Sequence, residues 1–245
     1  MQKFFISDTD SLDNTTIISG QDAKHISKVL RMKPGDMIDL TDGQGTDFKG
    51  EILEISKQAV KVMIRETAGS STESPLSITV FQGMLKDRKM DTLVRHLTEL
   101  GISDWIPLKC ERAVAVPNAE KAAGRIRRWE TISREALKQC RRSMAPEIGS
   151  PVSINEMAES AADFDLKIVF QENASSSSPE LEEFKHLNIR KIAVMIGPEG
   201  GFSDNEIETV QKLGFRPYLM GPRILRAETA ATAACTLIQH IFGDL

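Results

Sequence analysis

The sequence predicts an α/β protein, with a small N-terminal β-barrel followed by an α/β domain built on a mostly parallel sheet. Residues 1–66 read as short strands between Gly/Asp turns, a rhythm that is typical of a small barrel. From Leu76 onward strand patterns alternate with helix patterns, which indicates a parallel sheet covered on both faces. A stretch of small and polar residues separates the two parts. We therefore expect domains at 1–68 and 76–245, joined by a linker at 69–75.

The individual elements follow from the runs of apolar residues. In the first domain we expect a short helix at 22–30 and strands at 3–6, 15–18, 37–41, 47–55 and 60–64. In the second domain we expect strands at 76–82, 104–108, 166–170, 191–196 and 216–219. The helices expected between these strands lie at 87–100, 119–143, 154–161, 204–213 and 226–243.

Two glycine-rich turns near the C-terminus are the most informative feature. The first, Gly197-Pro-Glu-Gly-Gly-Phe-Ser203, leads into Ser203-Asp-Asn-Glu206, which has the spacing of a helix capping box. The second, Leu219-Met-Gly-Pro-Arg-Ile-Leu-Arg226, leads into an Ala/Thr-rich helix. Open α/β sheets bind ligands at the carboxyl ends of neighbouring strands, and glycine lets backbone atoms approach a ligand closely. We expect a ligand pocket here rather than two ordinary helix-capping turns.

Other common site motifs are absent from the sequence. No G-x-x-x-x-G-K-[ST] occurs, and Asp42-Gly-Gln-Gly-Thr-Asp-Phe-Lys-Gly50 has its third glycine displaced and no helix pattern after it. The three cysteines lie far apart without metal-binding spacing, and the four histidines stand singly, so we expect no metal. We find no signal peptide and no apolar run long enough for a membrane span. With the odd cysteine count, this predicts a cytoplasmic protein without a membrane partner.

The two turns also carry a family resemblance. Gly197 to Ser203, followed by Gly221-Pro-Arg-Ile-Leu-Arg-Ala-Glu-Thr-Ala230, closely resembles the C-terminal signature of the RsmE family, which are S-adenosylmethionine-dependent methyltransferases of the SPOUT superfamily. His25-Ile-Ser-Lys-Val-Leu-Arg31 resembles the family's N-terminal domain. The further matches are Lys86-Asp-Arg-Lys-Met90, Thr98-Glu-Leu-Gly-Ile102, Pro107-Leu108 and Glu111-Arg112. The similarity therefore covers nearly the whole chain.

The resemblance implies both a fold and an activity. It implies a PUA-like RNA-binding barrel joined to a SPOUT domain with a C-terminal trefoil knot. The implied activity is transfer of a methyl group from S-adenosyl-L-methionine to N3 of a uridine in 16S rRNA of the small ribosomal subunit. The family's enzymes are expected to work as homodimers.

The resemblance also places the cofactor in the two turns and at the end of the strand expected at 166–170. The residues expected to bind it are Phe170, Gln171, Glu172, Ile196, Gly197, Pro198, Glu199, Gly200, Gly201, Leu219, Met220, Gly221, Ile224, Leu225, Arg226 and Thr229.

No pair of a nucleophile and a base stands out in the sequence, and the expected reaction needs none. Methylation at N3 requires removal of a weakly acidic proton and in-line attack on a methyl group, so positioning and charge stabilisation can supply most of the rate. We expect Arg226 to steady the uridine anion and Glu199 to accept the proton, with Glu228 or a water as the alternative acceptor. Both glutamates also suit a plain helix-capping role.

A basic stretch predicts the RNA-binding surface. The net charge is −4, yet residues 76–145 carry 14 basic and 8 acidic side chains. On the helix expected at 119–143 four cations share one face, and three more lie at three-residue spacing in the N-terminal helix. The predicted RNA-binding residues are His25, Lys28, Arg31, Lys86, Arg88, Arg112, Arg127, Arg134, Lys138, Arg141 and Arg142. Because aromatic residues are few, we expect contacts to phosphate and shape to dominate.

Two other functions fit the same sequence. One is a non-catalytic RNA-binding or ribosome-assembly protein that keeps the fold. The other is a SPOUT enzyme that modifies another rRNA base or a tRNA base. Two complete glycine turns favour an enzyme, because a binding protein without catalysis has no physical need for them.

Overall fold

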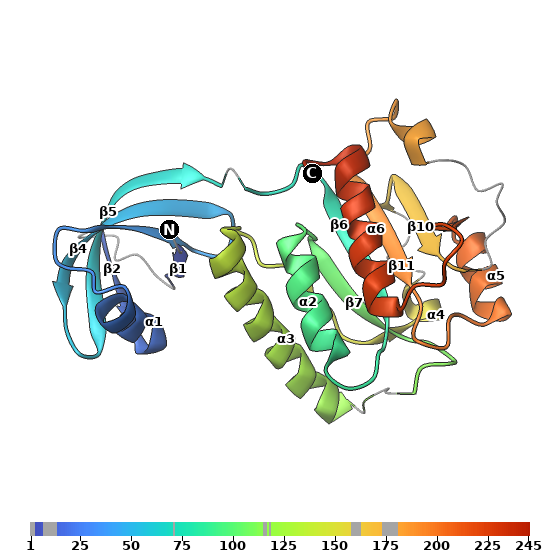
Figure 1. Ribbon diagram of the computed structural model, residues 1–245, viewed down its shortest axis with the longest axis horizontal. Coiled ribbons are helices and arrows are strands. Elements are labelled where there is room, and N and C mark those ends of the chain that lie inside the picture. The colour runs from blue at the N-terminus through green and yellow to red at the C-terminus, as the bar shows by residue number, and fades with distance from the viewer. Residues whose placement is uncertain are drawn as a thin grey trace. The chain divides into compact units, whose positions relative to one another are not determined.

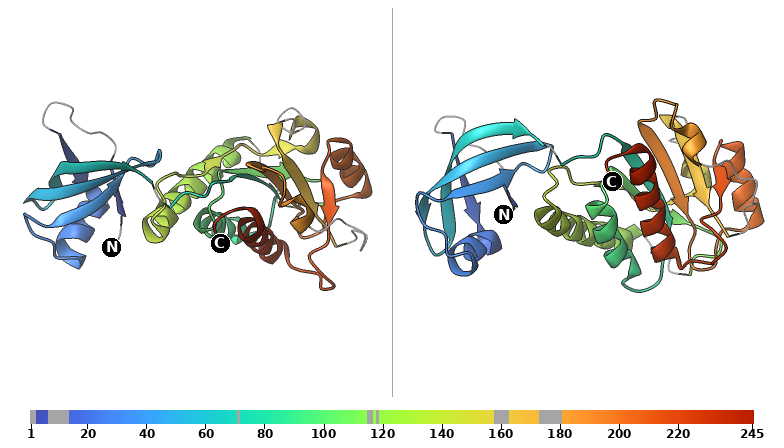
Figure 2. Two further views of the ribbon diagram at one scale, coloured as in Figure 1. Left: turned by 90° about the horizontal axis from the view of Figure 1, so that it is seen from above. Right: turned by 45° about the horizontal axis from the view of Figure 1, so that its top comes forward.

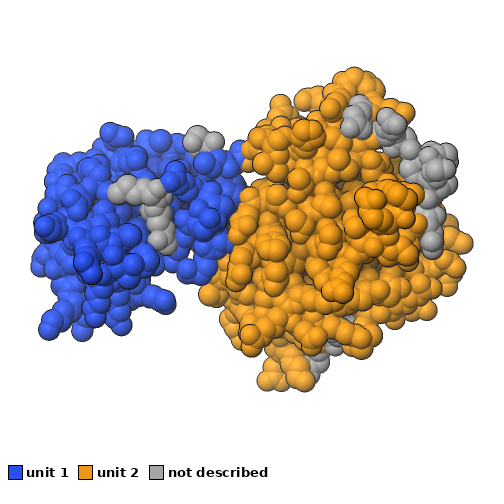
Figure 3. All heavy atoms as spheres, viewed as in Figure 1, with its two compact units in different colours: residues 1–73, 134–145 blue, residues 74–133, 146–245 orange. Residues whose placement is uncertain are grey.

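The structure, a computed structural model, describes residues 3–6, 14–70, 72–114, 117, 119–157, 163–172 and 181–245. The chain forms two compact units, residues 1–73 with 134–145, and residues 74–133 with 146–245 (Figure 3). The boundary between the two units, between Glu73 and Ser74, lies inside the linker expected at 69–75. In addition, a segment from the middle of the chain belongs to the N-terminal unit, which the expected boundaries did not include.

The N-terminal unit is a five-stranded sheet with a helix packed against it (Figure 1). The strand order is β1, β3, β4, β5, β2; β1 runs parallel to β3 and the other neighbours are antiparallel. Val60, Val62 and Ile64 alternate with more exposed residues and pack into one core, the period-two pattern of a half-buried strand. The strands are β1 (Lys3–Phe5), β2 (Thr15–Ser19), β3 (Met37–Thr41), β4 (Thr46–Ile55) and β5 (Ala59–Gly69).

The helix of this unit differs from the expected one. Helix α1 (Gly20–Lys24) runs directly into a π-helical segment, η1 (His25–Val29). Arg31 lies beyond η1 in a left-handed backbone conformation, with φ 53°. A π-helical turn is wider than an α-helical one, so residues three apart no longer stack on one face. The expectation that His25, Lys28 and Arg31 share a helical face is therefore wrong.

Ion pairs and hydrogen bonds explain why residues 134–145 belong to the N-terminal unit. The ammonium of Lys3 lies 2.7 Å from Asp47 and donates to the backbone carbonyl of Arg141 at 2.6 Å. The carboxylate of Glu73 accepts from Arg142 and from the backbone amides of residues 143 and 144. Because these partners are far apart in sequence, local patterns carry no signal of this arrangement.

The C-terminal unit is built on a seven-stranded sheet in which all neighbouring strands are parallel. The order is β12, β10, β11, β6, β7, β8, and β9 also pairs with β7. The strands are β6 (Ser77–Gly83), β7 (Asp104–Lys109), β8 (Glu147–Ile148), β9 (Val152–Ser153), β10 (Leu166–Phe170), β11 (Lys191–Ile196) and β12 (Arg216–Tyr218). The two-residue strands β8 and β9 were not predicted, because elements this short have no periodicity.

Helices cover both faces of this sheet (Figures 1 and 2). On one face α2 and α6 pack side by side, and Val194 and Ile196 of β11 lie in their core. On the other face Ala193 and Met195 of the same strand pack with α4 and α5. The helices of the unit are α2 (Lys89–Glu99), α4 (Ile154–Met157), η3 (Leu181–Phe184), α5 (Asp204–Lys212) and α6 (Ala227–Phe242). Residues 119–133 of the long α3 (Ala119–Cys140) also belong to it, and the last residues of α3 belong to the N-terminal unit.

Most expected elements agree with the structure to within one or two residues. Helix α3 ends at Cys140 rather than 143, because Arg141 turns the backbone into the left-handed region at φ 65°. The expected helix at 154–161 is described only to Met157, and its remainder lies outside the described residues. The parallel sheet with helices on both faces is that of the expected α/β domain, and the trefoil knot stays a prediction. No helix in the described part of the chain is long and apolar enough to cross a membrane.

Candidate functional site

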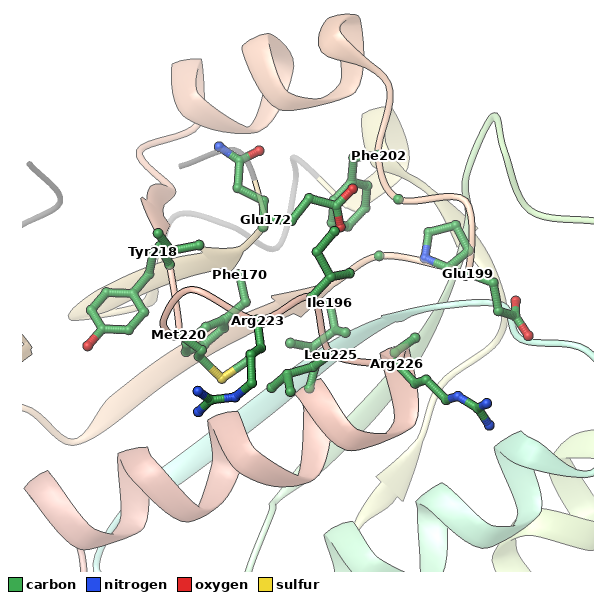
Figure 4. A pocket seen from close by; sticks show the side chains of 18 of the residues that line it. Phe170, Glu172, Ile196, Glu199, Phe202, Tyr218, Met220, Arg223, Leu225 and Arg226 are labelled. Carbon is green, nitrogen blue, oxygen red and sulfur yellow. The ribbon is translucent and has the colours of Figure 1, made fainter. Parts of the chain in front are cut away.

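A cavity of about 540 Å³ lies at the carboxyl ends of β10, β11 and β12 and beside the start of α6 (Figure 4). This is the end of a parallel sheet where α/β proteins bind ligands, and the volume suits a small molecule. All of the residues predicted to bind the cofactor line it except Gly200 and Thr229. Further lining residues that were not predicted for the cofactor are Lys89, Arg112, Phe202, Asp204, Tyr218, Arg223, Ala227 and Ala230.

The first glycine turn folds tightly on itself. The amide of Gly201 donates to the carbonyl of Pro198 at 2.9 Å, and Gly201 has φ 67°, a conformation that favours glycine. A Cβ on Gly197 would lie 3.3 Å from the Cα of Gly201. The predicted capping box is present, with Ser203 and Glu206 exchanging hydrogen bonds at the start of α5. Gly197 and Gly201 therefore bring backbone to the cavity wall, beside the side chains of Pro198, Glu199 and Phe202.

A glycine at the end of β6 supports this turn from behind. A Cβ on Gly83 would lie 2.4 Å from the backbone nitrogen of Pro198, so only glycine lets the turn approach the strand. Beside it the buried amide of Gln82 donates to the carbonyl of Gly83 at 2.9 Å and to that of Gly197 at 3.4 Å. The sequence signal for this approach was a single glycine at the end of a buried apolar run, which on its own has several meanings.

Arg112 supports the turn from the other side. One nitrogen of its guanidinium donates to the carbonyls of Gly200 at 3.3 Å and Phe202 at 3.1 Å. A Cβ on Gly200 would lie 3.1 Å from the Cβ of Arg112, so Gly200 faces this arginine rather than the cavity. Arg112, which we predicted to bind RNA, thus has a structural role beside the cofactor turn.

The second turn closes the opposite wall. The amide of Gln171, after β10, donates to the carbonyl of Tyr218 at 3.1 Å, and the rings of Phe170 and Tyr218 meet edge to face at 5.4 Å. Gly221 has φ 115°, and Arg226 is the N-cap residue of α6. These contacts hold the end of β10 against β12, and the second turn lines this wall with Leu219, Met220 and Leu225.

Three charged side chains of the lining, those of Lys89, Glu199 and Arg226, lie at one end of the cavity. Figure 4 shows the side chains of Glu199 and Arg226 at the end opposite Tyr218. Lys89, at the start of α2, donates to Glu199 at 3.0 Å, and the backbone amide of Lys86 donates to the same oxygen at 3.2 Å. Burial disfavours the charged form of Glu199, but these hydrogen bonds outweigh it and hold its pKa below the usual value. Glu199 is therefore ionised at neutral pH and can accept a proton.

The predicted RNA-binding residues fall into two groups. Lys28, Arg31, Lys86, Arg88, Arg112, Arg127, Arg134 and Arg141 have exposed side chains. The remaining residues have partners within the protein. Lys138 is buried and pairs with Asp22 and Glu135, Arg142 is buried and pairs with Glu73, and the half-buried His25 lies beside Phe4. Because a buried, paired cation does not present its charge to RNA, we remove Lys138 and Arg142 from the predicted surface.

Comparison with known proteins identifies the family. Residues 72–239 match the family model of an RNA methyltransferase domain, and residues 18–64 match that of an RNA methyltransferase PUA domain. A ribosomal RNA small subunit methyltransferase E (RsmE) from Buchnera aphidicola is 32% identical, with 99% of this chain and 94% of that protein covered. The chain belongs to the RsmE family. An RsmE from Bacillus subtilis is 30% identical, with 98% and 96% covered.

Two solved structures share the fold of this chain over nearly its full length. An RsmE from Neisseria gonorrhoeae, bound to S-adenosyl methionine, has a TM-score of 0.88 at 28% identity and covers 100% of this chain and 99% of its own. A putative methyltransferase from Legionella pneumophila, in complex with the same cofactor, has a TM-score of 0.84 at 31% identity, with 99% and 98% covered. Both chains therefore align along their full length with this one.

Proposed function

We propose that this RsmE-family protein is an S-adenosyl-L-methionine-dependent methyltransferase that methylates N3 of a uridine in 16S rRNA of the small ribosomal subunit. The observation that carries the proposal is the glycine-lined cavity with an ionised carboxylate and an arginine at one end. Its shape and position suit a small cofactor, and its charged end suits the removal of a proton from an incoming base.

The residues of the cavity fit this cofactor. Phe170, Ile196 and Leu225 offer an apolar surface for an adenine ring, and the backbone of both turns offers donors and acceptors for its polar edge and for the ribose. The carboxylate of Glu172 faces Gly201 and suits hydroxyl or ammonium donors of the ligand. When bound, the cofactor supplies a methyl group whose carbon–sulfur bond breaks, with the electron pair staying on sulfur, as the nitrogen of the base forms its bond.

The charged end supplies the rest of the chemistry. Glu199 accepts the N3 proton, and Arg226 steadies the negative charge that spreads over O2, N3 and O4 of the uracil ring. Arg226 stands at the N-terminus of α6, where backbone amides and the helix dipole add to the same stabilisation. The proton then leaves the protonated Glu199 for solvent, so charge and atoms balance over the cycle.

The RNA partner and the assembly state are part of the same proposal. The exposed cations of the basic stretch and the N-terminal PUA-like domain each contribute contacts to 16S rRNA. We propose a cytoplasmic homodimer, and one feature supports a second copy: Ile224 lines the cavity wall yet is 79% exposed. Light scattering on the intact protein tests this state, and a strictly monomeric protein would contradict it.

Single-turnover methylation of small subunits tests the proposed chemistry. Arg226→Ala should lower the rate by roughly 10²–10³, as loss of one oxyanion donor does in other enzymes, while cofactor affinity changes little. Arg190→Ala is the matched control, because Arg190 is exposed and does not line the cavity. A near-normal rate in Arg226→Ala would make this residue structural only.

Nucleoside mass spectrometry tests the proposed product. Cells that lack the protein should lose one 3-methyluridine from 16S rRNA, and the wild-type protein should restore it. An unchanged set of modified nucleosides would favour the non-catalytic alternative. Loss of a different modified base would favour another SPOUT activity.

A further inference from the structure

One lysine lies between two carboxylates at the charged end of the cavity. The ammonium of Lys89 is 3.0 Å from Oε1 of Glu199 and 3.7 Å from Oε2 of Glu228. Glu199 belongs to the first glycine turn, whereas Glu228 lies in the first turn of α6, so Lys89 on α2 links the two elements that form this end. Lys89 and Glu199 line the cavity and Glu228 does not.

The two carboxylates differ in how well they are bonded. Oε1 of Glu199 accepts from Lys89 and from the amide of Lys86. Oε2 of Glu228 is buried and accepts no hydrogen bond from the residues that the structure describes, and its 3.7 Å separation from Lys89 is beyond hydrogen-bond distance. A buried acceptor that lacks a donor is unfavourable, and less than about 1 Å of movement by the flexible lysine would supply one.

We propose that Lys89 is a positioning residue for methyl transfer, whose ammonium holds Glu199 at the cavity wall in the free protein and moves to Glu228 when a uracil ring takes its place. The inference rests on the proposed function for its substrate. The move exchanges one charged hydrogen bond for another of the same kind. It opens one acceptor position on Oε1 of Glu199 for the N3–H of the base, while the amide of Lys86 stays bonded to the same oxygen. It also leaves a cation nearby while the ring becomes an anion.

The electrostatics of the free protein agree with a shared lysine. The hydrogen bond to Glu199 raises the pKa of Lys89, the charges of Glu199 and Glu228 raise it further, and Arg226 opposes them. These are the charged groups that act on Lys89 from the first turn and from the start of α6. Conversely, removal of Lys89 should let the pKa of Glu199 rise, because burial then acts with fewer hydrogen bonds against it.

A titration of the free protein tests, without any methyl transfer, whether Glu199 and Glu228 both interact with the ammonium of Lys89. The side-chain NMR signal of Lys89 should titrate above the ordinary lysine range in the wild type. Glu199→Gln should lower that pKa clearly, and Glu228→Gln should lower it by a smaller amount. A Lys89 pKa that neither substitution changes would overturn the proposal.

The pH dependence of single-turnover methylation tests the role in catalysis. Glu199 must be ionised to accept the proton, so the rate falls at acid pH as Glu199 becomes protonated. At subsaturating small subunits the acid limb reports the free protein, in which Lys89 bonds Glu199, so in Lys89→Met this limb should move to higher pH. The neutral-pH rate should be at least about tenfold lower, because this cation no longer lies near the uracil anion. Lys89→Arg should keep the limb near its wild-type position. Glu228→Gln, which weakens the second acceptor, should lower the rate without moving the limb.

Controls separate this inference from a fold defect and from the proposed function. Calorimetry should show S-adenosylmethionine affinity within about twofold of wild type in Lys89→Met, because the lysine acts on the carboxylates. Lys212→Met removes an exposed cation of the same unit and should change nothing. An acid limb and a rate in Lys89→Met that match wild type would overturn the positioning role. If the wild-type protein methylates no uridine, the proposed function fails, and the titration still decides whether Lys89 is shared.

Discussion

Two glycines shape the cavity through the side chains that they lack. Gly201 holds a backbone conformation with φ 67°, and Gly83 lies where any Cβ would meet the backbone of Pro198. The two requirements differ in kind, because the first is conformational and the second is steric. The sequence drew attention to Gly201, since it stands in a glycine-rich turn. The sequence did not predict the role of Gly83, because the turn that Gly83 contacts is more than a hundred residues away in the chain.

Gly201→Ala tests the conformational requirement. The left-handed conformation costs a residue with a Cβ about 1–2 kcal/mol, so the free energy of unfolding should fall by about that amount. The new methyl group faces Glu172 at the cavity wall, and cofactor affinity should fall as well. Denaturant unfolding and calorimetry measure the two effects.

The matched control for this substitution is Gly124→Ala on α3. Gly124 is exposed in a helix and a Cβ there meets nothing within 4 Å. This change should raise the free energy of unfolding by about 0.5–1 kcal/mol and leave the cofactor affinity unchanged. Equal affinity in wild type and Gly201→Ala would show that the first turn does not contact the ligand.

At the scale of elements, the sequence predicted what local pattern determines. Alternation in β5, the apolar run of β11 and the capping box of α5 each depend on residues close in sequence, and each is present in the structure. The π-helical segment η1 was not predicted, because its sequence also fits an ordinary α-helix. The same holds for the site. Both glycine turns were predicted from local sequence, whereas the places of Lys89 and Arg112 at the cavity were not, because these residues lie in segments far away in the sequence.

Arg112 connects the segment after β7 to the first glycine turn. Arg112 donates hydrogen bonds to two carbonyls of that turn. Arg112→Met should therefore let the turn shift and lower S-adenosylmethionine affinity by roughly tenfold, because each hydrogen bond removed contributes about 0.5–1.5 kcal/mol. Arg112→Lys keeps the charge but lacks the guanidinium geometry, so it should also lose affinity. Calorimetry checks both variants. If Arg112→Lys binds cofactor and RNA normally, and Arg112→Met loses only RNA, the residue is an RNA contact instead.

At the scale of the whole molecule, charge is distributed unevenly along the chain. The basic stretch lies between acidic neighbours, so the net charge of −4 says little about its partner. The structure then divides the cations of that stretch by their surroundings. Arg127, Arg134 and Arg141 are exposed, whereas Lys138 is buried between Asp22 and Glu135. Helical spacing alone placed all four on one face, because it contains no information about acidic partners on other elements.

The salt dependence of RNA binding distinguishes these two kinds of cation. Neutralising Arg127, Arg134 and Arg141 to Gln should flatten the slope of log K against log salt by roughly 0.7–0.9 for each RNA phosphate that is no longer neutralised. Lys138→Met should leave the slope unchanged, because its charge is already neutralised within the protein. It should instead lower the free energy of unfolding by about 1.5–3 kcal/mol, since Asp22 loses a charged hydrogen bond. Filter binding of small-subunit RNA from low to physiological salt, with denaturant unfolding of each variant, measures both quantities.

A slope that the arginine substitutions leave unchanged would show that this row of charges is only a solvated surface. A slope that Lys138→Met flattens would show that its ion pair opens when RNA binds.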